Sequence, residues 1–102
     1  MGLTPARVRK LVGALPDTAE GAHHGHPDFR VKKKIFATLS ETEERAALRL
    51  TQVEARALAE RSPKTYRLVS DHDPISWVSV LLEAVDENEF SDLLEEAWRL
   101  RS

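Results

Sequence analysis

Cysteine is absent from this chain of 102 residues, and methionine occurs once. Without cysteine there is no disulfide framework, no thiolate nucleophile and no cysteine-ligated zinc or iron–sulfur site. Long apolar runs are also missing: none approaches the roughly 20 residues that span a bilayer, and the amino-terminal segment lacks the apolar core of a signal peptide. We therefore expect a cytoplasmic protein with no membrane association.

Hydrophobic residues make up 41% of the chain and charged residues 31%, which is typical of a globular protein. We expect one domain over residues 1–102, acting as a monomer. The net charge of −2 is unevenly distributed, because residues 1–40 hold seven Lys/Arg against three Asp/Glu, whereas residues 41–102 hold eight against 14. The basic first part could meet phosphate, or the two parts could simply have differently charged solvent faces.

Three segments have the periodicity of amphipathic helices, over residues 4–15, 51–62 and 86–102. Thr4 is placed to cap the first helix, with Pro5 at its first position. Thr51 and Asp86 begin the other two, each three residues before a glutamate, which is the spacing of a capping box. The residues expected to be buried are Val8, Leu11, Val12 and Leu15, then Val53, Ala57 and Leu58, and finally Phe90, Leu93, Leu94, Ala97 and Leu100.

Alternating apolar and polar residues predict five strands: residues 28–31, residues 35–39, a strand containing Leu48 and Leu50, residues 65–70 and residues 75–85. Residues 17–21 are expected to be a connection. Ile35, Ala37 and Leu39 should share one face of the second strand. The last strand is apolar on both faces, so we expect either a central position in the sheet or a strand covered on both faces.

The expected order is therefore α-β-β-β-α-β-β-α. Short connections between the strands imply hairpins and an antiparallel sheet. The fold class that follows is α+β, a two-layer domain with a five-stranded antiparallel sheet and flanking helices.

Three histidines, His23, His24 and His26, lie within four positions. In an extended strand His24 and His26 would project from one face about 7 Å apart, while His23 would point to the other face. Apart from Glu20 and the distant His72, no side chain completes a zinc-like set. We expect histidines that face solvent or pair across strands; His24 and His26 are the metal candidates to be tested.

The densest cationic run is Lys32, Lys33 and Lys34, with Arg30 just before it. This run is expected at the tip of a hairpin, where it could grip the phosphates of a nucleic acid without reading bases. The alternative is a solvated turn whose lysines protect a sheet edge from aggregation. Both interpretations remain open from the residues alone.

Other polar and aromatic groups favour structural roles. Asp71, His72 and Asp73 stand before Pro74 in a pattern typical of a turn. The aromatic residues able to stack on bases are Trp77, Trp98 and Phe36, but each lies in or beside an apolar pattern, so we expect them in the core. The chain contains none of the common motifs for phosphate loops, hydrolase nucleophiles, zinc proteases or dinucleotides. We expect no enzymatic activity and no cofactor.

The segment "HPDFRVKKKIFATL", preceded by "LPDTAEGAHHG" and followed by "WVSVLL" and "AWRL", resembles the YjbR, or MmcQ, family of small bacterial proteins over nearly the whole chain. The most specific matches are Leu15-Pro16, Glu20-Gly21, Phe29 to Val31, Lys34 to Ala37, and Trp77. The resemblance implies a CyaY-like fold, one antiparallel sheet with flanking helices. It also implies DNA binding by two β-hairpin wings, an analogy at the level of the fold that carries no catalytic residues.

Carried over to this chain, the first wing is the hairpin from Arg30 to Lys34 and the second is residues 68–77. Asp71 and Asp73 at the second tip would repel phosphate. The expected partner is double-stranded DNA, with a protein or small ligand as the alternative. The residues expected to contact DNA are Arg30, Lys32, Lys33 and Lys34, assisted by Arg7 and Lys10.

Overall fold

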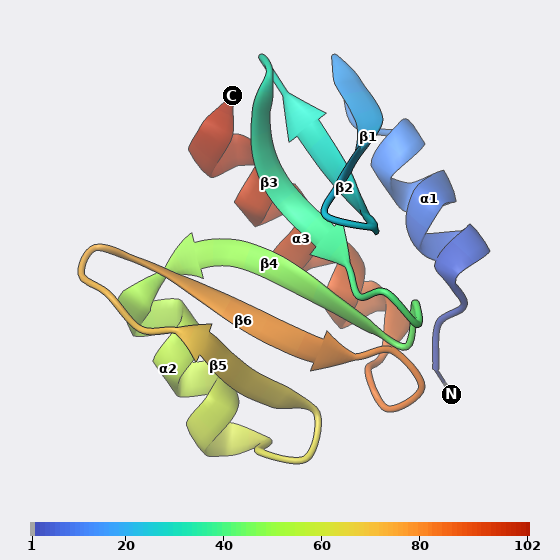
Figure 1. Cartoon of the computed structure of the whole chain (residues 1–102). Coiled ribbons are helices and arrows are strands. Elements are labelled where there is room, and N and C mark those ends of the chain that lie inside the picture. The colour runs from blue at the N-terminus through green and yellow to red at the C-terminus, as the bar shows by residue number, and fades with distance from the viewer. Residues whose placement is uncertain (1) are drawn as a thin grey trace.

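The computed structural model describes residues 2–102, without the side chain of His23. It contains three helices and six strands (Figure 1). In chain order these are α1 (Pro5–Gly13), β1 (Thr18–His23), β2 (His26–Val31), β3 (Lys34–Leu39), β4 (Arg45–Thr51), α2 (Gln52–Arg61), β5 (Tyr66–Ser70), β6 (Ile75–Leu81) and α3 (Glu87–Arg101).

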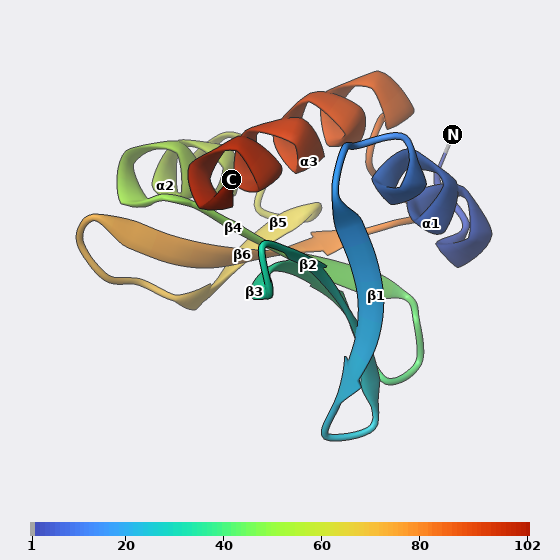
Figure 2. The ribbon, with the colours of Figure 1, turned by 90° about the horizontal axis from the view of Figure 1, so that it is seen from above.

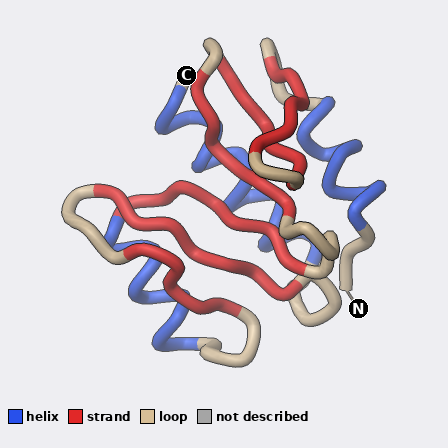
Figure 3. The backbone as a smooth tube through the Cα atoms, viewed as in Figure 1, coloured by secondary structure: helices blue, strands red, loops and turns tan. Residues whose placement is uncertain are grey.

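The strands form one sheet in the order β1-β2-β3-β4-β6-β5, and every neighbouring pair is antiparallel (Figure 3). Helix α2 and strand β5 lie between β4 and β6 in the sequence, yet β6 pairs with β4, and β5 pairs with β6 alone and forms an edge of the sheet. The expected α+β class and the interior position of β6 are therefore confirmed.

The sheet has six strands rather than the expected five, so the order is α-β-β-β-β-α-β-β-α. The strand that was missed is β1, with the sequence TAEGAH, which pairs with β2 along its whole length. A turn of two residues joins them, His24 and Gly25, with φ of 49° and 84°. Positive φ at both central residues suits a tight hairpin. Strand β1 has almost no apolar residues to alternate, so periodicity could not reveal it.

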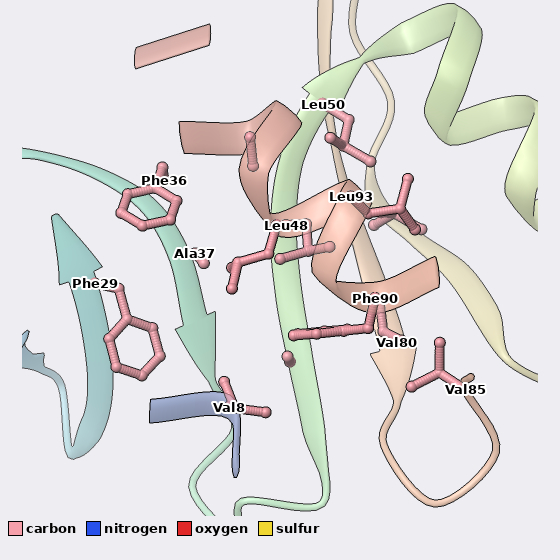
Figure 4. Packing of buried hydrophobic residues seen from close by; sticks show 14 of the residues in the cluster. Val8, Phe29, Phe36, Ala37, Leu48, Leu50, Val80, Val85, Phe90 and Leu93 are labelled. Carbon is pink, nitrogen blue, oxygen red and sulfur yellow. The ribbon is translucent and has the colours of Figure 1, made fainter. Parts of the chain in front are cut away.

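All three helices of the described chain pack on the same face of the sheet, as Figure 2 shows. The core lies between these two layers. Phe90 and Leu93 of α3 lie over Leu48 of β4 and Val80 of β6 (Figure 4), and all four are buried. A buried phenylalanine or leucine side chain stabilises a fold by about 1.5–3 kcal/mol relative to an exposed one.

The expected helix caps are confirmed. The side-chain oxygens of Thr4, Thr51 and Asp86 accept hydrogen bonds from the backbone N–H three residues on, at 3.1, 3.2 and 3.0 Å. The expected buried face of α2 was wrong in part, since Val53 is 81% exposed and Ala57 is exposed as well, whereas Ala55 is buried. Residues two apart on a helix do not share a face, and α2 packs through Ala55 and Leu58.

The expected face of β3 was also wrong at one position. Ala37 and Leu39 are buried as expected, but Phe36 joins them in the core while Ile35 does not. The register of β2 and β3 shifts between Phe29 and Arg30, which is the mark of a bulge. An extra residue in one strand turns the following side chains to the other face.

Candidate functional site

The sheet has an open face, defined here as the face opposite the three helices (Figure 2). In β4, the residues Ala46, Leu48 and Leu50 are buried beneath the helices. Because side chains alternate along a strand, Ala47 and Arg49 point to the open face. The register extends this face across the sheet, pairing Arg49 with Trp77, Ala47 with Ser79, and Ser79 with Arg67 of β5.

Four arginines lie on or beside the open face: Arg45, Arg49, Arg67 and Arg101. The Nε of Arg45 donates to the hydroxyl of Ser79 at 2.6 Å, and its Nη2 donates to the carbonyl of Ser79 at 3.4 Å. The Nε of Arg101 donates to the carbonyl oxygen of Ile35 at 3.1 Å. These are neutral partners, so they position the guanidinium groups without cancelling their charge.

The other arginines are held differently. The ion pairs recorded within residues 2–102 involve Arg7, Arg9, Arg30, Arg56, Arg61 and Arg99. None of these pairs includes an arginine of the group Arg45, Arg49, Arg67 and Arg101. The uncompensated guanidinium charge of the described chain is therefore gathered on one face of the sheet.

The charges of these arginines act on one another. Burial lowers the pKa of Arg45, and the positive charge of Arg67 lowers it further. The pKa of Arg49 is lowered in the same way, first by burial and then by the charge of Arg101. Each guanidinium stays charged at neutral pH, and like charges held close together without a carboxylate favour the arrival of an anion.

The hairpin lysines occupy the expected place. Lys32 and Lys33 form the turn between β2 and β3, with φ of 51° and 67°, and Lys34 begins β3. All three are exposed. Lys34 directly precedes Ile35, whose carbonyl holds Arg101. The three lysines and the four unpaired arginines of the open face are called the basic surface below.

Arg30 was expected to act together with these lysines, but it has a partner of its own. Its Nε and Nη2 donate to the two carboxylate oxygens of Asp28 at 2.9 and 3.1 Å, and Asp28 is fully buried. This hydrogen-bonded pairing raises the pKa of Arg30. Together with Lys32 and Lys33, Arg30 lines a depression of about 470 Å³ that also contains Asp17. The Arg30 charge is compensated, so this residue contributes less attraction for an anion than the lysines do.

Trp77 was expected in the core, and that expectation was wrong. It lies on the open face of β6, half-buried, opposite Arg49. The other two aromatic residues fulfil the expectation: Phe36 is buried, and Trp98 packs against the core with its indole N–H donating to the carbonyl of Pro16. The difference arises because both faces of β6 carry apolar residues while helices cover only one of them.

Around Trp77 the open face is hollowed. The depression has a volume of about 370 Å³ and is lined by Ile35, Thr38, Ala47, Val69, Trp77 and Arg101. Val69 is 63% exposed and extends the apolar lining of this depression. An aromatic and aliphatic floor therefore lies between the guanidinium groups of the basic surface.

Two expected contact residues lie elsewhere. Arg7 and Lys10 are on α1, in the layer of helices. The guanidinium of Arg7 donates two hydrogen bonds to Glu87, at 2.7 and 3.0 Å, and this pairing raises its pKa. The charge of Arg7 is thus compensated and is separated by the sheet from the open face.

The histidine segment forms the β1–β2 tip. His23 pairs with His26 in the strand register, and His24 lies in the turn. The side chain of His23 lies outside the described part of the chain, so whether the three rings converge stays untested. Among the described residues no group of three or more His, Asp or Glu side chains is placed to hold a metal ion.

The second expected wing ends in the turn between β5 and β6. Asp71 accepts hydrogen bonds from Arg56 at 2.9 Å and from Gln52 at 3.1 Å. The hydroxyl of Ser76 donates to the carbonyl of His72 at 2.9 Å within the same turn. Asp71 therefore ties the tip to α2, in keeping with the structural role expected of this segment.

Sequence reasoning missed Arg45, Arg49, Arg67 and Arg101. A signal was present for the first two, because in RAALRLT the arginines alternate with buried residues and must face away from the core. What the alternation could not show was that no helix of the described chain covers that face.

Within the described residues 2–102, no helix has the length and apolar character needed to cross a membrane.

Comparisons with known proteins agree with this architecture. The crystal structure of the Deinococcus radiodurans protein DR2400, with its DUF419 domain, is similar with a TM-score of 0.80 and 20% sequence identity, over 95% of this chain and 77% of that one. At this identity the likeness concerns the fold. No curated protein matches the sequence. The sequence model of the YjbR family matches residues 13–100. With nearly its whole length matched, the chain belongs to the YjbR family.

Proposed function

We propose that this domain binds nucleic acid through phosphate contacts made by the basic surface. The observation that supports the proposal most directly is the separation of the arginines into two groups. Arg56 of α2 and Arg99 of α3, for example, are paired with carboxylates, whereas Arg45, Arg49, Arg67 and Arg101 are not. A chain with a net charge of −2 thus retains a positive face.

The chemistry of the basic surface suits a polyphosphate. A guanidinium presents a planar fork that matches two phosphate oxygens, whereas an ammonium acts as a flexible point charge. Arg45, Arg49 and Arg67 stand on strands, Arg101 on the last turn of α3, and Lys32 and Lys33 on a turn, so rigid and adaptable contacts are combined. Phosphate contacts position a nucleic acid but carry no sequence information. We therefore propose binding with little sequence preference and no catalytic step.

The test is fluorescence anisotropy of labelled random-sequence DNA, titrated with the protein at several salt concentrations. Two variants remove parts of the basic surface: one changes Lys32, Lys33 and Lys34 to glutamine, and the other combines R49Q with R67Q. The matched control, R56Q with R99Q, removes two positive charges from the helical layer. We expect affinity to fall steeply with salt and in both test variants, while the control binds as the wild type does.

The outcome that contradicts the proposal is an absence of binding at low salt, where electrostatic attraction is strongest. Equal losses in the control and in the R49Q/R67Q protein would also contradict it, because net charge rather than the basic surface would then decide affinity.

A second candidate is a small or protein ligand with an apolar, anionic group. The supporting observation is the depression around Trp77, whose volume of about 370 Å³ lies within the range of about 300–1,000 Å³ found for small-ligand sites. A partner recovered with the protein after nuclease treatment, and lost in R49Q/R67Q, would favour this candidate over nucleic acid.

A further inference from the structure

Trp77 is not part of the buried core. It lies on the open face of an interior strand, and the core is built on the opposite face by Val78 and Val80. Within residues 2–102 the structure records no hydrogen bond from its indole N–H. Trp98, by contrast, is fixed by its bond to the carbonyl of Pro16. A large, half-buried ring on an interior strand is suited to contact a ligand.

The surroundings of Trp77 indicate the ligand's chemistry. Arg49 lies directly across from it on β4, and Arg101 shares the same depression. Apart from Thr38, the rest of the lining is apolar, including Ile35 and Val69. A planar apolar ring flanked by two unpaired guanidinium groups matches a partner that alternates planar rings with anions. Nucleic acid has this pattern along each strand.

The faces of the bases are accessible only in an unpaired strand. In a duplex they are stacked on one another, and a protein reaches only base edges through the grooves. Trp77 lies on the floor of the sheet rather than on a projecting tip, and the β1–β2 hairpin extends from the sheet on the side away from the helices (Figure 2). A duplex bound to the open face would present its backbone to the depression around Trp77. A single strand, by contrast, can turn its bases toward the Trp77 ring.

We propose that the open face binds single-stranded nucleic acid in preference to duplex, with one base stacked on Trp77 and the neighbouring phosphates at Arg49 and Arg101. This inference rests on the proposed function and narrows its substrate class. DNA and RNA share the chemistry that the site uses, namely a planar base between phosphates, and the test separates them.

The test compares three labelled probes: oligo-dT and oligo-rU of roughly 15 nucleotides, a length within the usual single-strand site sizes, and a DNA duplex of the same length. The variant Trp77→Leu keeps an apolar side chain but removes the aromatic face, and Trp77→Phe restores a smaller ring. We expect the wild type to bind at least one single strand about tenfold more tightly than the duplex. W77L should lose about 5- to 100-fold of that affinity, W77F should recover most of it, and duplex affinity should stay unchanged.

Intrinsic fluorescence gives an independent readout. In Trp98→Phe the signal comes from Trp77 alone, since the chain has two tryptophans. Stacking on a base should quench it when oligonucleotide is added. In W77L the remaining signal from Trp98 should not change when oligonucleotide is added, and circular dichroism of the free protein shows whether that variant is folded.

The outcomes separate the two proposals. Duplex bound as tightly as single strands, or W77L binding single strands as the wild type does, overturns this inference and leaves phosphate binding intact. No binding of any probe at low salt overturns both. Displacement of oligo-dT by polyglutamate at the same charge concentration overturns the inference as well, since the face would then select anions without regard to bases.

Discussion

Arg101 in the last turn of α3 donates a hydrogen bond from Nε to the carbonyl oxygen of Ile35 in β3, at 3.1 Å. The contact joins residues 66 positions apart in the sequence. It brings a guanidinium from the helical layer to the depression on the open face and next to the lysine hairpin. One side chain thereby connects the two parts of the basic surface.

The first prediction concerns this connection. R101Q should weaken binding of a single strand and reduce the slope of log affinity against log salt by about 0.7, the contribution of one phosphate contact in single strands. The reason is that a neutral amide releases no counterion from the nucleic acid. Anisotropy titrations with oligo-dT at four or more salt concentrations measure the slope.

The control is R99Q, which removes the same charge two residues earlier in α3. Arg99 donates to Glu96, so its charge is already compensated. Its salt slope should match that of the wild type. If R99Q and R101Q change the slope equally, the inference that Arg101 contacts a phosphate because of its position is wrong.

The second prediction concerns the close approach of β1 and β2. A Cβ atom added at Gly21 would lie 2.9 Å from Oδ1 of Asp28. Asp28 is fully buried and is held by Arg30 through two hydrogen bonds, so it cannot easily move aside. Overpacking of this kind costs about 1–3 kcal/mol. Urea denaturation of G21A should therefore show a lower midpoint than the wild type.

Gly13 provides the control, because a Cβ there would meet nothing within 4 Å. It ends α1, where alanine is favoured over glycine by up to about 1 kcal/mol. G13A should unfold at the same urea concentration as the wild type or at a higher one. An unchanged midpoint for G21A would show that Asp28 and Arg30 adjust to the methyl group.

Local physical rules recovered much of the fold from the sequence. Cap residues such as Thr4 and Asp86 act on backbone groups three residues away, so their role depends on little else. The periodicity of α3 also suffices, because one stripe of the helix must be buried. The turn at Lys32 and Lys33 follows from the two alternating segments that flank it. In each case the residues that predict the element lie in the same short stretch of sequence as the element itself.

Several of the expectations that failed depended on distant parts of the chain. Strand β1 exists because β2 pairs with it, and the bulge beside Ile35 depends on the register between β2 and β3. The open face depends on where three helices settle, which no single strand encodes. Trp77 was placed in the core because its strand is apolar on both faces, and only the packing of the helices decides which face is covered.

The third prediction concerns the start of α2. The hydroxyl oxygen of Thr51 accepts from the backbone N–H of Glu54 at 3.2 Å. T51A should lower the free energy of unfolding by about 1 kcal/mol, because the capped N–H loses its partner. T51S keeps an oxygen in place and should recover most of the loss. Chemical denaturation monitored by circular dichroism measures both; equal stability of T51A and T51S would assign the effect to the lost methyl group.

The fourth prediction concerns acid stability at the β5–β6 turn. The hydrogen bonds from Arg56 hold the pKa of the Asp71 carboxyl below its ordinary value of 3.8. A carboxyl with a lower pKa in the folded state stabilises the fold above its unfolded pKa, and this contribution is lost as the pH falls through the folded value. D71N should therefore be less stable than the wild type at about pH 6, and the difference should shrink toward about pH 2.

Thermal unfolding of both proteins across this pH range measures the difference in melting temperature. D92N is the control, because Asp92 is exposed on α3 and the structure records no ion pair for it within residues 2–102. Its melting temperature should follow that of the wild type at every pH. A D71N difference that stays constant on acidification would mean that the amide disturbs the turn by its geometry, since loss of a charge interaction must disappear once the wild-type carboxyl is protonated.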